Sequence, residues 1–160
     1  MKLSAQLKKQ KAFTLIELLV VIGVLAVLLA ITLIAINPAR QFQQANNTKR
    51  QSDVGIILNA INQYMAGNNG SLPAGIPATA VSVATAVNIG NAAGGADICT
   101  PLVSTYIAAL PFDPNAIGAH FTSCTDYDLQ YSIYQSANSR ITIFAPSTEP
   151  ATAPDISVTR

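Results

Sequence analysis

An apolar run close to the N-terminus constrains this chain more than any other feature of its sequence. The run extends from Phe13 to Ile36, and its only charged residue is Glu17. As a helix, about 24 residues rise about 36 Å, which is enough to cross the hydrocarbon core of a bilayer with some tilt. A carboxylate inside such a span costs roughly 2.5–3.5 kcal/mol on insertion scales, so Glu17 needs a partner or a specific role.

Two explanations of the run are incomplete. A secretory signal peptide has an apolar core of about 7–15 residues, followed by a small-x-small cleavage site. Here the core is longer, and the best distal candidate, Leu33-Ile34-Ala35, has a large first residue. A plain transmembrane anchor explains the length and the orientation. It leaves Glu17 and the abrupt change from Lys11 to Phe13 unexplained.

The third explanation is a leader that is cut off in front of the apolar run, so that the run stays in the mature protein. The sequence Lys-Gln-Lys-Ala-Phe-Thr-Leu-Ile-Glu-Leu-Leu, which begins at Lys9, resembles the class III signal of type IV pilins and type II secretion pseudopilins. The resemblance is specific from Lys8 to about Leu28. It favours a pilin-like protein over a plain anchor.

That resemblance implies roles for three residues. A prepilin peptidase is expected to cut between Ala12 and Phe13, and the new amino group of Phe13 to be N-methylated. Glu17 corresponds to the acid that the family keeps five residues into the mature chain, where it serves assembly. The family usually has glycine before the cut. Ala12 departs from this pattern, and we expect slower processing for that reason.

The nominal net charge of +1 does not describe the mature chain, because four lysines precede the proposed cut. These are Lys2, Lys8, Lys9 and Lys11. Without them, five basic side chains remain against eight acidic ones, a net charge of −3, which argues against a nucleic-acid-binding surface. By the positive-inside rule the lysines hold the N-terminus in the cytoplasm. We expect a single pass through the inner (cytoplasmic) membrane, and the resemblance implies a cell-surface filament after assembly.

Composition divides the chain into four segments. They are a leader over 1–12, a transmembrane and assembly helix over 13–36, an amphipathic helix over 37–66, and a head over 67–160 with an extended tail. Asn37-Pro38 predicts a kink or break between the two helices. The second helix is predicted to pack on the head from Val54 onward. Its part from Gln41 to Ser52 is polar nearly all round and is predicted to cross a gap or contact neighbouring subunits. The predicted polar face comprises Gln43, Asn47, Arg50, Gln51, Asn59 and Asn62.

The head is predicted to contain a small antiparallel sheet. Apolar residues alternate over 129–133 and 141–143, with a turn at 136–139, which is typical of a hairpin. A further strand is expected near 81–87, and a short helix or strand over 102–110. The tail from Pro146 is predicted to run extended and to be mobile. The expected fold class is α+β, with a long N-terminal helical spine packed on this sheet.

Cys99 and Cys124 both lie in the exported part of the chain. An even count in an oxidising compartment favours a disulfide, and two cysteines allow only one intramolecular pairing. Closing a loop of about 25 residues contributes roughly 3 kcal/mol in the chain-entropy model. The alternative is a pair of buried free thiols.

No catalytic constellation emerges, and no enzymatic activity or cofactor is expected. His120 is the single histidine and lacks any motif that positions a nucleophile beside it, so we expect a surface residue. Asp113, Asp126 and Asp128 are the nearest approach to a calcium site, but their spacing fits no loop motif. Solvated turn aspartates are the alternative, and no metal site is predicted.

Two functions remain after these exclusions. The first is a structural subunit of a type IV pilus-like filament, polymerised through its N-terminal helix with other copies of itself. The alternative is a pseudopilin or minor pilin of a type II secretion or DNA-uptake system. The expected partners are the prepilin peptidase and methylase, the membrane, and the pilus assembly platform.

Overall fold

The computed structural model describes residues 13–76 and 81–160. The proposed leader, including Ala12, lies outside the described residues. The chain forms two compact units, the first ending at Gln41 and the second extending from Phe42 to Arg160.

The first unit consists mainly of the helix α1 (Leu15–Ile36), with Thr14 as its N-cap. None of its residues is buried, so its apolar surface is exposed on all sides. The helix ends at Asn37, which has a left-handed backbone (φ 46°) that asparagine tolerates better than most residues. Pro38 then begins the next helix, at a position where its missing N–H costs nothing. The interruption predicted at Asn37-Pro38 is therefore a break between two helices.

The helix α2 (Pro38–Gly67) packs on the head through a face that includes Val54, Ile57, Leu58 and Ile61. Glycine and asparagine end it, as the sequence predicts: Gly70 has a positive φ of 81°, and its N–H donates to the Met65 carbonyl at 2.8 Å. The buried face starts earlier than predicted. Arg50, which the sequence pattern assigns to the polar face, is only 1% exposed.

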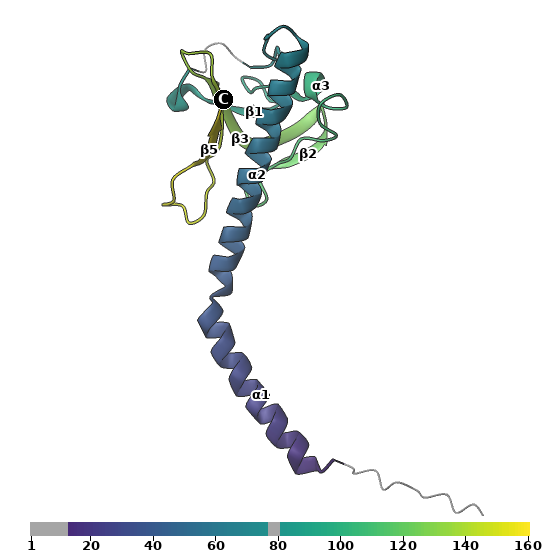
Figure 1. Cartoon of the computed structure of the whole chain (residues 1–160), viewed down its shortest axis with the longest axis vertical. Helices are drawn as coiled ribbons and strands as arrows, with labels where there is room; N and C mark the ends of the chain where they lie inside the picture. Colours follow the sequence, from purple (N-terminus) through teal and green to yellow (C-terminus); the bar gives the residue numbers. More distant parts are fainter. Residues whose placement is uncertain (1–12, 77–80) are drawn as a thin grey trace, which may run out of the picture. The chain divides into compact units, whose positions relative to one another are not determined.

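A five-stranded antiparallel sheet packs beside α2 in the head. Its strands are β1 (Val87–Gly90), β2 (His120–Ser123), β3 (Asp126–Gln135), β4 (Ile141–Ala145) and β5 (Ile156–Thr159). The order is β1-β3-β4-β5, and β2 pairs with the first residues of β3. The short helix α3 (Cys99–Leu102) and α2 share one apolar core with the sheet, and α2 runs across the sheet (Figure 1). This arrangement is the α+β fold that the sequence predicts, and β3 and β4 form the predicted hairpin.

Two local predictions differ in part from the structure. The strand expected near 81–87 begins only at Val87, after a 3₁₀ turn over Val83–Thr85. The Thr85 hydroxyl accepts hydrogen bonds from the N–H groups of Val81 and Ser82, and such local bonds compete with strand pairing. The tail is predicted to be extended and mobile, and its last residues are extended but paired: they form β5, which pairs with β4 while Ile156 and Val158 alternate toward the core.

Candidate functional site

Glu17 lies in the first turn of α1, where a capping box holds its side chain. The backbone N–H and the hydroxyl of Thr14 both donate to Glu17 Oε2, at 2.9 and 2.8 Å. In return, the Glu17 N–H donates to the Thr14 hydroxyl at 3.2 Å. The box satisfies backbone donors that a helix N-terminus leaves open, and the positive end of the helix dipole favours a carboxylate there.

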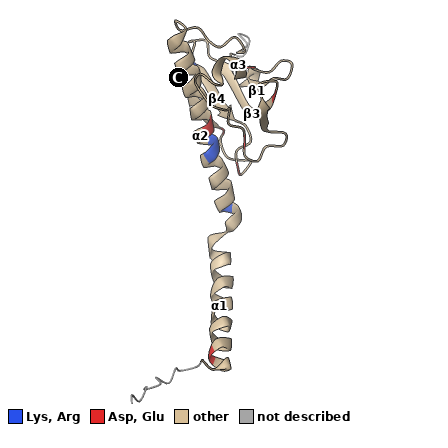
Figure 2. Cartoon of the chain, turned by 90° about the vertical axis from the view of Figure 1, so that its right-hand side faces the viewer, with Lys and Arg blue, Asp and Glu red and all other residues tan. Residues whose placement is uncertain are grey.

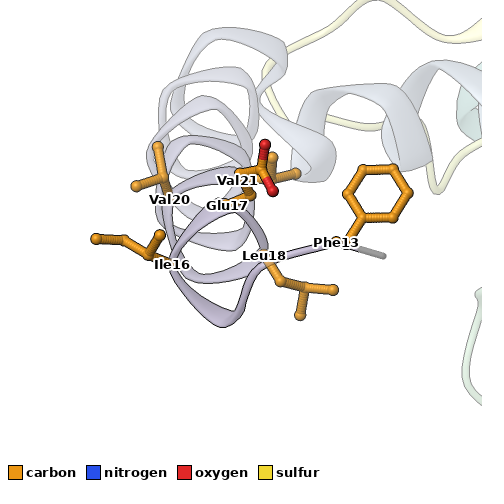
Figure 3. A pocket seen from close by; sticks show the side chains of 6 residues that line it. All are labelled: Phe13, Ile16, Glu17, Leu18, Val20 and Val21. Atoms are coloured by element: carbon orange, nitrogen blue, oxygen red, sulfur yellow. The ribbon is translucent and has the colours of Figure 1, made fainter. Parts of the chain in front are cut away.

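The surroundings of Glu17 are apolar. Phe13, Ile16, Leu18, Val20 and Val21 line a shallow hollow with it, and these side chains surround the start of α1 in Figure 3. Glu17 is the single charged residue of α1, and Figure 2 shows the acidic colour near the N-terminal end of this helix. Both Thr14 donors reach Oε2, and among the described residues no donor reaches Oε1. The free oxygen can accept a hydrogen bond from a cation such as an ammonium group.

Thr14 is absent from the site residues predicted from the sequence, although a signal for it exists. A threonine followed three residues later by glutamate, just before an apolar run, is the sequence pattern of a capping box. Phe13, at the proposed cut, precedes this cap and is highly exposed. Its partner in the cut, Ala12, lies outside the described residues, so cleavage at this bond remains a prediction.

Cys99 and Cys124 are joined by a disulfide in the structure, with Cα atoms 5.2 Å apart. Cys99 begins α3 and is buried in the core, while Cys124 lies in the turn between β2 and β3. The bridge therefore ties α3 to the sheet. No free cysteine remains among the described residues.

The three aspartates considered for calcium have separate partners. Asp113 is buried and accepts two hydrogen bonds from Arg50. Asp128 accepts from the side chains of Asn88 and Gln130. No group of three carboxylate, histidine or cysteine side chains with metal-binding geometry occurs in residues 13–76 and 81–160.

Asp126 pairs with His120, at 3.2 Å between Oδ1 and Nε2. Both side chains are largely exposed, at 63% and 46%. Hydrogen bonds with the Gly118 carbonyl and with Asp126 raise the pKa of His120 above its ordinary value. The pair lies on the surface and joins the first residues of β2 and β3.

A buried polar cluster around Arg50 was not predicted from the sequence. The Arg50 Nε and Nη2 atoms donate to Asp113 at 2.7 and 3.0 Å, and Nη1 donates to Glu149 at 3.2 Å. Burial acts to raise the pKa of Asp113. Hydrogen bonds from Arg50 and from the N–H groups of Asn115 and Ala116 outweigh it and hold the pKa below its ordinary value. The pair connects α2 with the loop at Asp113 in the interior of the head.

Comparison with known protein families identifies the N-terminal segment. Residues 7–33 match the family model described as the prokaryotic N-terminal methylation motif. No match was found among curated proteins or among solved structures. The matched residues contain the proposed cut, the capping box and most of α1.

The motif is that of the class III prepilin leader, and the chain is consistent with the type IV pilin and pseudopilin family. The helix α1, which is long and apolar enough to cross a membrane, fits a membrane-anchored protein of this kind. The motif indicates a structural protein rather than an enzyme.

Proposed function

We propose that this protein is the structural subunit of a type IV pilus-like filament. It is inserted in the cytoplasmic membrane as a prepilin, cut between Ala12 and Phe13, methylated on the Phe13 amine, and polymerised through α1. The observation that carries the proposal is the methylation motif over residues 7–33, which coincides with an apolar helix that holds one acid. Other copies of the chain, the prepilin peptidase and the assembly platform are its partners.

The chemistry of α1 supports polymerisation. A helix that exposes apolar side chains on every face leaves the bilayer only if equivalent surfaces replace the lipid, and copies of the same helix do so. Cleavage would create an ammonium group on Phe13, one helical turn from Glu17. In a filament, the Phe13 amine of one subunit pairs with the Glu17 carboxylate of a neighbour, at Oε1, which the Thr14 donors do not use. Such a pair neutralises two charges inside an apolar core and selects one register between subunits.

Intact-mass analysis of the membrane-bound and filament-bound protein tests the processing step. We expect loss of residues 1–12 and the gain of about one methyl group on the new N-terminus. A mature chain that starts at Met1, or near Ile36, contradicts the proposal. Replacing Ala12 with leucine should leave uncut precursor in the membrane, whereas Ala12→Gly should be cut at least as fast as the native chain.

The pseudopilin or minor pilin remains the second candidate, because the same motif serves both classes. The abundance of the protein in surface filaments distinguishes the two candidates. A major subunit is the main band of sheared surface filaments in mass spectrometry, and a pseudopilin or minor pilin is a trace component.

A further inference from the structure

The segment 146–155, which we call the strap, connects β4 to β5, and its side-chain hydrogen bonds to the rest of the head concentrate at one residue. Glu149 makes five hydrogen bonds to residues outside the strap. In the described residues, every side-chain hydrogen bond between the strap and α2 involves Glu149. The strap contributes no residue to the apolar core of the head, and its one buried side chain besides the part-buried Glu149, Thr148, bonds within the strap to the Ala153 carbonyl.

The Glu149 carboxylate lies among three donors. Oε2 accepts from the Asn46 side chain at 2.8 Å and from Arg50 Nη1 at 3.2 Å, and Oε1 accepts from the Asn115 side chain at 2.9 Å. The hydrogen bond from Asn46 and the charge of Arg50 hold the pKa of Glu149 below its ordinary value. A carboxylate suits this position because it is an acceptor only, whereas a neutral amide would turn a donor toward other donors.

The backbone of Glu149 is also paired with α2. Its N–H donates to Asn47 Oδ1 at 3.0 Å, and its carbonyl accepts from the Asn47 side-chain amide. Asn47 Oδ1 accepts a second bond from Arg50 Nη1 at 2.8 Å, which fixes the Asn47 amide in place. The Asn47 side chain therefore pairs with both backbone groups of Glu149, as the backbone of a neighbouring strand would.

The two acidic partners of Arg50 differ in exposure. The Asp113 side chain is fully buried, and the Glu149 side chain is 22% exposed. The Asp113 N–H also donates to the Leu129 carbonyl of β3 at 3.0 Å, so the inner partner belongs to the core. The outer partner belongs to a segment whose remaining residues are mostly exposed.

We propose that the strap is a latch closed by the charge of Glu149, which opens as a local unit while the core of the head stays folded. Opening breaks the bonds of Glu149 and leaves Arg50 paired with Asp113. It uncovers Arg50 Nη1 and the side-chain amides of Asn46 and Asn47, a set of donors that fits a carboxylate from another molecule. The proposal is independent of filament formation.

Hydrogen exchange on the mature full-length chain in detergent micelles tests the latch. The Glu149→Gln variant keeps the shape of the side chain and removes its charge. We expect peptides over 147–153 to exchange at least about tenfold faster, after correction for intrinsic rates, while peptides over β3 and β4 change less than about twofold. Asp155→Asn is the matched control, because it removes an equal charge from an exposed position of the same strap. It should leave the exchange of both regions unchanged.

Three outcomes overturn the proposal. Exchange of the strap in Glu149→Gln equal to that of the native chain shows that the charge does not close it. An equal acceleration over the strap and over β3 and β4 shows that the strap is part of the core. An equal effect of Asp155→Asn shows that the position of the charge is irrelevant.

Discussion

Glu17 is the residue on which the proposed assembly depends most directly. Over residues 13–76 and 81–160 only Thr14 donates to this side chain, and it reaches one of the two oxygens, so Thr14 holds the carboxylate in place without neutralising it. A side chain in this state is oriented for a cation and remains costly in lipid until it finds one. The neighbouring hydrophobic residues give no alternative partner for it.

Replacing Glu17 with leucine should therefore separate assembly from folding. We expect the variant to insert, to be cut and to fold its head normally, because no residue of α1 is buried and the core of the head lies in the other unit. Filament yield should fall at least about tenfold, since the ammonium group of Phe13 would enter the apolar core without its partner. The measurement is the amount of subunit in sheared filaments relative to the membrane.

Val21→Leu is the control for that variant, because Val21 lies one turn further along α1 and borders the same hollow. It should assemble as the native chain does. If Glu17→Leu assembles equally well, the role assigned to Glu17 is wrong. If Glu17→Leu accumulates uncut, the residue acts in processing instead.

At the scale of elements, Arg50 and the disulfide join parts of the head that lie far apart in the sequence. Arg50 connects α2 with the loop at Asp113, 63 residues later. Cys99 and Cys124 connect α3 with the turn after β2. The two connections lie on different loops and use different chemistry, so their effects on stability should be independent.

Asp113→Asn should destabilise the head by about 3–5 kcal/mol, because it leaves a buried guanidinium without its main countercharge. Urea unfolding of the full chain in detergent measures the loss. Asp126→Asn breaks an exposed pair with His120 and should cost about 0–1 kcal/mol. Similar effects of the two variants would contradict the importance given to burial.

The disulfide prediction is checked by non-reducing peptide mapping of protein from the cell surface. We expect a linked pair of peptides containing Cys99 and Cys124. The double Cys→Ser variant should lose roughly 3 kcal/mol of unfolding free energy, with processing unchanged. Free thiols that react with an alkylating agent before reduction would show that the bridge is absent.

At the scale of the whole molecule, acid should destabilise the head. The pKa values of Asp113 and Glu149 lie below their ordinary values, so these groups release protons more readily in the folded chain. Their contribution is complete above about pH 4–5 and is lost as the pH falls through the lower folded values. The urea midpoint should fall between about pH 4 and pH 2, and Asp113→Asn should remove part of this dependence.

The contribution of His120 to stability depends on pH in the opposite direction. Its pKa is raised, so its contribution is present below its ordinary value of about 6.5 and is lost as the pH rises through the folded value. The side chain is exposed, and solvent screens the effect. His120→Gln should therefore leave the acid transition unchanged. If the acid transition shifts in His120→Gln, then Asp113 and Glu149 do not dominate that transition.

The sequence predicted the parts of this fold that depend on local patterns. The hairpin of β3 and β4 follows from alternation, and the break at Asn37 follows from the proline after it. The Arg50 cluster could not be found in this way, because hydrophobic periodicity assigns an arginine to the solvent and contains no information on distant acids. Thr14 could have been predicted from the sequence, since the capping-box pattern is local.

The break at Asn37 also has a consequence for the depth of α1 in a bilayer. The helix α1 ends at Ile36, so the carbonyls of its last turn lack helical donors, and hydrocarbon supplies no substitute. Water at the headgroup level does supply one. We expect Ile34 and Asn37 to mark the outer boundary of the membrane. The break would then set how deeply α1 is inserted before the subunit is withdrawn from the lipid.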